Sequence, residues 1–64
     1  MVIVNGENKN IDGMTIAEYL KQENLAPDRI AVMLGENIVP KASYETTVLS
    51  DGDTLEVVGF VGGG

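Results

Sequence analysis

Three consecutive glycines, Gly62, Gly63 and Gly64, close the 64-residue sequence and form its most informative stretch. They follow the apolar pair Phe60 and Val61 without a polar spacer. Because glycine has no Cβ, an extended glycine run can pass through a narrow cleft and present a terminal carboxylate to an enzyme. The alternative is a frayed terminus, since ordering glycine costs more conformational entropy than ordering any other residue.

The composition removes most other routes to chemistry. The sequence contains no cysteine and no histidine, so it offers no thiol nucleophile, thiolate metal ligand or imidazole base. Asp51-Gly52-Asp53 lacks the further ligands that a calcium-binding loop needs, and Ser43 and Ser50 have no base to activate them. We therefore expect no catalysis by the chain itself and no metal site.

A terminal carboxylate is itself a possible reaction centre. With an ordinary pKa of about 3.3–3.7, it is ionised at neutral pH and is a poor electrophile until activated. Attack on the α-phosphorus of ATP would give an acyl-adenylate, and a sulfur nucleophile could then displace AMP to leave a thiocarboxylate. Such a carrier would hold sulfur on its own backbone.

The charge balance indicates what kind of partner to expect. Ten acidic residues against four basic ones give a formal net charge of −6, which disfavours nucleic acids and anionic membranes. A basic protein surface is the expected partner. The first residues do not resemble a signal peptide, so we expect a cytoplasmic protein.

The first half of the chain predicts a hairpin followed by a helix. Met1 to Val4 reads as a strand, Asn5-Gly6 as a tight turn, and Asn8 to Ile11 as the second strand. Thr15 starts the helix in the S/T-x-x-E pattern, and the helix is expected to end near Asn24 because a proline follows.

The second half predicts short strands. Arg29 to Leu34 reads as a third strand, and Ile38-Val39 as an edge or very short strand because Pro40 follows it. Lys41 to Glu45 is expected to be a loop or one helical turn, and Thr46 to Leu49 could form another brief strand.

The last strand is predicted to run from Thr54 to about Phe60. Alternation puts Leu55 on a buried face and Val58 and Phe60 on the face of Glu56, where they would make a small apolar patch. The alternative is that a twist or bulge turns Phe60 inward. The whole order predicts an α+β roll, in which a small mixed sheet has one main helix packed on one face.

Three stretches together resemble the sulfur carrier proteins of thiamine biosynthesis, the ThiS family. They are Ile38-Val39-Pro40-Lys41, Asp51 to Val58, and Gly62-Gly63-Gly64. The resemblance covers the whole chain and implies a ubiquitin-like β-grasp fold, with residues 1–60 as one domain and residues 61–64 as a flexible C-terminal tail.

The same resemblance implies a pathway. Gly64 would be adenylated by a ThiF-like adenylyltransferase that uses MgATP, converted to a thiocarboxylate with sulfur from a donor such as a cysteine desulfurase, and presented to a ThiG-like thiazole synthase. The carrier would bind no cofactor. The implied partner-binding residues are Val58, Phe60, Val61, Gly62 and Gly63.

Two alternatives stay open at this point. The chain could carry sulfur for molybdopterin synthesis, or act as another ubiquitin-like carrier. It could also be a regulatory or binding module of the same roll topology, in which case binding would map to the sheet face and the glycines would be dispensable.

Overall fold

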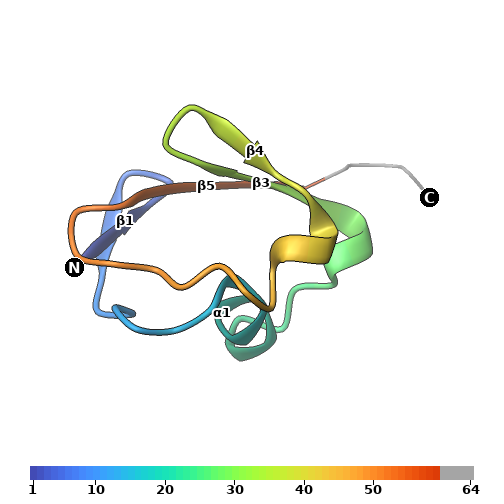
Figure 1. The fold of residues 1–64 in the computed structure, drawn as a ribbon, viewed down its shortest axis with the longest axis horizontal. Helices are drawn as coiled ribbons and strands as arrows, with labels where there is room; N and C mark the ends of the chain where they lie inside the picture. Colours follow the sequence, from blue (N-terminus) through green and yellow to red (C-terminus); the bar gives the residue numbers. More distant parts are fainter. Residues whose placement is uncertain (60–64) are drawn as a thin grey trace.

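A computed structural model describes residues 1–59 of the chain, which form a five-stranded sheet with one α-helix on one side (Figure 1). In chain order the elements are β1 (Val2–Val4), β2 (Glu7–Lys9), α1 (Ile16–Gln22), the 3₁₀ turn η1 (Pro27–Arg29), β3 (Ile30–Leu34), β4 (Asn37–Val39), the 3₁₀ turn η2 (Lys41–Ser43) and β5 (Thr54–Gly59).

The first hairpin forms at the predicted turn. Asn5 and Gly6 have φ values of 49° and 85°, the pair of left-handed conformations that a type I′ turn requires. This turn places Glu7 directly opposite Val4, so β2 begins at once. The prediction of a second strand at Asn8–Ile11 was therefore displaced towards the C-terminus, because a two-residue turn leaves no residue between itself and the strand.

The helix begins as predicted. The Thr15 hydroxyl accepts a hydrogen bond from the backbone N–H of Glu18 at 3.1 Å, and the Glu18 carboxylate accepts one from the backbone N–H of Thr15 at 2.8 Å. This reciprocal capping box is confirmed. The helix ends at Gln22, slightly before the predicted Asn24, whose φ of 62° is left-handed and cannot continue a right-handed helix.

The sheet is mixed, with strand order β2-β1-β5-β3-β4. β5 lies in the centre, parallel to β1 and antiparallel to β3, while the two hairpins β1–β2 and β3–β4 are antiparallel. Strand β4 is an edge strand, as the following proline predicts. The predicted arrangement of a small mixed sheet with one main helix on one face is confirmed (Figure 1).

The segment between η2 and β5 runs beside the start of the helix instead of forming the predicted strand at Thr46–Leu49. Only Val48 makes a β-bridge, to Thr15. The backbone N–H groups of Thr46 and Thr47 donate to the carbonyl of Ser43, so a local turn uses the groups that a strand would need. The predicted third strand is also one residue shorter, because Arg29 belongs to η1.

The core lies between the helix and the sheet. Its buried apolar side chains form one cluster: Val2, Val4, Ile11, Ile16, Tyr19, Leu20, Ile30, Val32, Val39, Tyr44, Leu49 and Leu55. Both tyrosines are thus core residues. None of the described helices is long and apolar enough to cross a membrane.

Candidate functional site

Most of the residues predicted to carry the sulfur or to bind partners lie beyond the part of the chain that the structure describes. Phe60, Val61, Gly62, Gly63 and Gly64 fall outside residues 1–59, so the roles predicted for them stay predictions. Val58 lies within the described residues, near the end of β5. It gives the starting point from which the site is built.

Alternation along β5 separates a core face from an exposed one. The Leu55 side chain is fully buried against the helix, whereas Val58 is 53% exposed on the opposite side of the sheet. Glu56 is exposed and shares the side of Val58, because side chains two apart on a strand point the same way. The predicted exposure of Val58 is confirmed.

Neighbouring strands extend this exposed side into an apolar surface. We call it the open face, and it comprises Ile3 of β1, Ala31 and Met33 of β3, Ile38 of β4, and Val58 of β5. Each of these lies next to at least one buried or half-buried residue of its own strand. No helix of residues 1–59 lies across this side of the sheet (Figure 1).

The strand register brings these side chains together. Ala31 stands opposite Val58, and Met33 stands opposite both Glu56 on one neighbouring strand and Ile38 on the other. Ile38 is 73% exposed, the highest value among the exposed large apolar side chains of the described chain. Cross-strand neighbours of this kind lie within contact distance, so the side chains on β3, β4 and the end of β5 form a contiguous apolar surface. Ile3 lies at its margin, opposite Thr54.

Sequence reasoning identified only Val58 on this surface. Alternation places Ala31 and Met33 on the same side of β3, but five consecutive apolar residues do not show which side of a strand is buried. Ile38 and Ile3 were missed because their place on the same face as Val58 depends on strand order and register. Alternation could have identified Ile38, because it directly precedes the buried Val39 and adjacent residues of a strand point to opposite sides of the sheet.

One charged side chain lies in this apolar surround. Glu56 is exposed and makes no ion pair with any residue of the described chain. An apolar surface that carries a single unpaired carboxylate is suited to docking a partner with apolar side chains and a lysine or arginine. The Glu56 carboxylate has no second acid, base or nucleophile beside it on this surface, so the arrangement supports binding.

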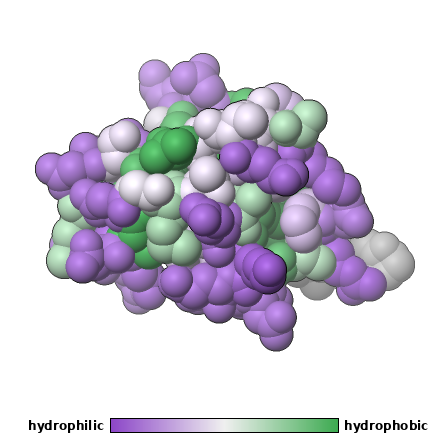
Figure 2. All heavy atoms as spheres, turned by 60° about the horizontal axis from the view of Figure 1, so that its bottom comes forward, coloured by the Kyte–Doolittle hydropathy of each residue, from purple (hydrophilic) through white to green (hydrophobic). Residues whose placement is uncertain are grey.

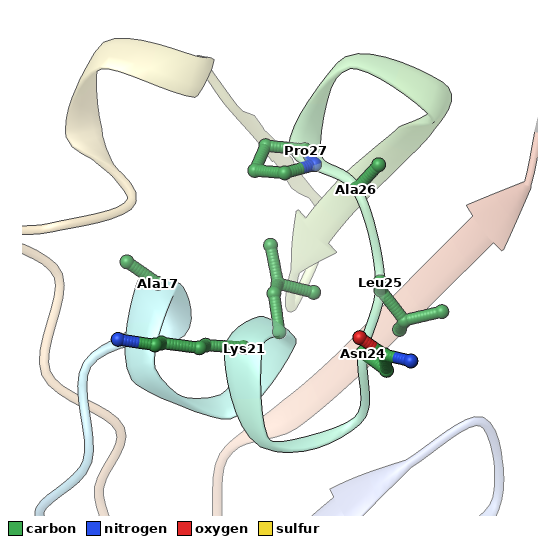
Figure 3. A pocket seen from close by; sticks show the side chains of 7 residues that line it. Ala17, Lys21, Asn24, Leu25, Ala26 and Pro27 are labelled. Atoms are coloured by element: carbon green, nitrogen blue, oxygen red, sulfur yellow. The ribbon is translucent and has the colours of Figure 1, made fainter.

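The opposite side of the molecule differs in character. Figure 2 looks onto the helix side, where hydrophilic residues dominate and apolar ones appear in small areas between them. An open groove of about 390 Å³ lies between the C-terminal half of α1 and the segment that follows it (Figure 3). It is lined by Ala17, Leu20, Lys21, Asn24, Leu25, Ala26 and Pro27, which provide no acid–base pair.

The groups whose pKa values are shifted lie away from the open face. Burial raises the pKa of the Tyr19 hydroxyl in the core. Hydrogen bonds from the Met1 amine to Asp51, and secondly to Asp12, raise the pKa of that amine. Within residues 1–59, no three acidic side chains are grouped closely enough to hold a metal ion.

The architecture defines a ubiquitin-like β-grasp protein, as predicted, and solved structures agree. The crystal structure of a thiamine biosynthesis protein (ThiS) from Geobacter metallireducens superposes with a TM-score of 0.77 at 25% identity, covering 98% of this chain and 97% of that one. A solution structure of a thiamine biosynthesis protein from the same organism gives a TM-score of 0.76 at 28% identity, covering 98% and 86% of the two chains.

The sequence places the chain more narrowly. The ThiS family model matches residues 2–64, and the chain belongs to the ThiS family. The sulfur carrier protein ThiS of Thermus thermophilus is 34% identical over 64 residues, which cover 100% of both chains.

Two thiazole synthases also contain a similar stretch. The enzyme of Paramagnetospirillum magneticum is 39% identical over 64 residues, and that of Magnetococcus marinus is 37% identical over 62 residues. These alignments cover 98% and 95% of this chain but only 20% and 19% of the two enzymes. The chain therefore spans about a fifth of the length of the thiazole synthases it matches.

Proposed function

We propose that this protein is a sulfur carrier for thiamine biosynthesis and that the carboxylate of Gly64 carries the sulfur. The observation that supports this most strongly is the similarity to the sulfur carrier protein of Thermus thermophilus along the whole chain. Membership of the ThiS family and the glycine run at 62–64 are consistent with it. The protein acts as a co-substrate of other enzymes.

The proposed chemistry has two steps. A carboxylate oxygen of Gly64 attacks the α-phosphorus of MgATP, the bond to the β,γ-phosphates breaks, and pyrophosphate leaves. A sulfur nucleophile at the oxidation level of hydrosulfide then attacks the acyl carbon, and AMP leaves. Where the donor offers a persulfide, a thiol reductant first releases the hydrosulfide and is itself oxidised to a disulfide. The product is a C-terminal thiocarboxylate, and the partner enzyme supplies the positive charge that stabilises both transition states.

The open face is the proposed docking surface for the activating enzyme. Its apolar side chains and the unpaired Glu56 favour a partner surface that combines apolar residues with a cation, in agreement with the net charge of −6. Val58 brings this surface to the end of β5. From there Phe60, Val61, Gly62 and Gly63 lead to Gly64, and an extended chain from Gly59 to Gly64 reaches at most about 17 Å.

The proposed partners are a ThiF-like adenylyltransferase, a ThiG-like thiazole synthase and a sulfur donor such as a cysteine desulfurase. The thiazole synthase is supported by the two enzymes that contain a stretch similar to this chain. A ThiS-like segment within a thiazole synthase would keep carrier and acceptor together. For this protein, we propose that the carrier and a thiazole synthase bind each other when the carrier delivers its sulfur.

A truncation tests the proposal. The full chain and a variant lacking Gly63 and Gly64 are incubated with the adenylyltransferase and MgATP, and pyrophosphate release is measured. The full chain should react and the truncated variant should not. Thermal stability should be nearly the same in both, because glycine has no side chain to pack.

The control is an established ThiS carrier treated with its own adenylyltransferase. Equal pyrophosphate release from the full and truncated chains would overturn the assignment of Gly64. No reaction of the full chain with any ThiF-like enzyme that activates the control carrier would overturn the carrier function.

A further inference from the structure

Asn5 occupies the first position of the β1–β2 turn, where its φ of 49° is left-handed. Asparagine is favoured there because it tolerates this conformation, and glycine would tolerate it as well. The turn alone therefore explains the backbone of Asn5. It does not explain what the side chain does.

The side chain of Asn5 pairs with a peptide group of the central strand. Its Oδ1 accepts a hydrogen bond from the backbone N–H of Val57 at 2.9 Å, and its Nδ2 donates to the carbonyl of Val57 at 3.2 Å. The backbone N–H of Asn5 donates to the carbonyl of Leu55 at 2.9 Å. The side-chain amide of Asn5 therefore makes with Val57 the two hydrogen bonds that the backbone of a neighbouring strand residue would make.

These contacts lie where β1 stops supporting β5. The two strands are paired only as far as Val4 and Leu55. Beyond that point β3 pairs with β5 on one side, and the Asn5 amide takes the place of β1 on the other. The end of β5 carries Val58 of the open face and leads directly into residues 60–64.

We propose that Asn5 is a positioning residue for the C-terminal segment, an inference that rests on the proposed carrier function. By holding both polar groups of the Val57 peptide, it fixes β5 immediately before Val58 and sets the point from which the following residues reach the partner enzyme. Without the amide, these groups turn to water and the end of β5 frays from one side. Val58 then leaves the open face for part of the time.

The substitution Asn5→Gly separates this role from the turn. Glycine keeps the left-handed backbone without strain and removes only the side chain. The matched control is Asn24→Gly, because Asn24 is the other non-glycine residue of the described chain with positive φ, and no side-chain hydrogen bond is formed by it within residues 1–59. Both variants therefore change the same residue type in the same conformation.

Two measurements decide the question. Amide hydrogen exchange followed by NMR should show the Val57 amide exchanging about tenfold faster in Asn5→Gly, relative to the Ile3 amide that bonds to Asp53 at the other end of the same strand pair. The KM of the chain for its adenylyltransferase should rise about threefold to tenfold while kcat stays within about twofold, because only docking is impaired. Asn24→Gly should change neither quantity.

Each outcome has a distinct meaning. An unchanged Val57 exchange rate in Asn5→Gly would show that the amide does not hold β5. Faster exchange with an unchanged KM would show that the contact is structural only, and either result overturns the inference while the carrier function stands. If the unaltered chain is not adenylated, the proposed function fails, and the inference falls with it even where Val57 exchange responds.

Discussion

Val58 offers the sharpest test of the open face as a docking surface. Its side chain is 53% exposed, and we expect Val58→Ala to weaken docking without weakening the fold. Val48 provides a matched control, because it is the same residue type at 54% exposure. Val48 lies in the segment beside the start of α1, bridged to Thr15, and is not part of the open face.

The magnitude follows from the exposed half of the Val58 side chain. Complete burial of a valine side chain is worth about 1.5–3 kcal/mol, so covering the remaining half in a complex is worth about 1 kcal/mol. Truncation to alanine loses most of this contribution. A loss of about 1 kcal/mol corresponds to a roughly fivefold increase in the KM for the adenylyltransferase, with kcat nearly unchanged.

The assay compares three proteins under identical conditions: the unaltered chain, Val58→Ala and Val48→Ala. Adenylation is followed by pyrophosphate release over a range of carrier concentrations, and thermal unfolding is followed by circular dichroism. Both variants should unfold at similar temperatures. Equal KM values for the two variants, or a raised KM in Val48→Ala alone, would refute the assignment of the open face as the docking surface.

Two further predictions concern stability. Thr15→Ala removes the hydroxyl that caps α1 and should cost about 1 kcal/mol, or about 4–8 °C in the unfolding temperature of a domain this small; an unchanged Tm would contradict the capping role. Asp51→Asn removes the main hydrogen-bonding partner of the Met1 amine, whose pKa lies above its ordinary value of 8.0, while the pKa of Asp51 lies below 3.8. The amine's contribution is complete below pH 8.0 and lost as pH rises through its raised pKa, and the carboxylate's is present above pH 3.8 and lost as pH falls through its lowered pKa. The two proteins should therefore differ slightly in Tm between these limits and converge outside them, and parallel Tm curves across the whole range would contradict the pairing.

Local sequence signals predicted those parts of the fold that local interactions form. The capping hydrogen bonds join only Thr15 and Glu18, and the tight turn needs only the left-handed conformations of Asn5-Gly6. Both features therefore depend on residues that are close together in the sequence. Both were predicted correctly for that reason. Strand β2 was predicted too far towards the C-terminus, because the strand begins directly after the turn. The strand expected at Thr46–Leu49 does not form, because a local turn uses backbone N–H groups that the strand would need.

The open face could be predicted only in part, because it depends on non-local pairing. Alternation within β5 was sufficient to predict that Val58 is exposed. Ala31 stands opposite Val58 on the next strand. Ile3, Met33 and Ile38 join the same face only through the order and register of the strands. The Asn5 side chain reaches a peptide group 52 positions away in the sequence, and no local pattern announces such a contact.

The carrier proposal depends on activation and sulfur transfer at the carboxylate of Gly64, and intact-protein mass spectrometry tests this most directly. The natural protein is incubated with the adenylyltransferase, MgATP and sulfide, then weighed and digested. We predict a gain of about 16 Da, for replacement of one oxygen by sulfur, located on the peptide that contains Gly64. An unchanged mass while a control carrier reacts, or a natural protein that continues beyond Gly64, would contradict the account.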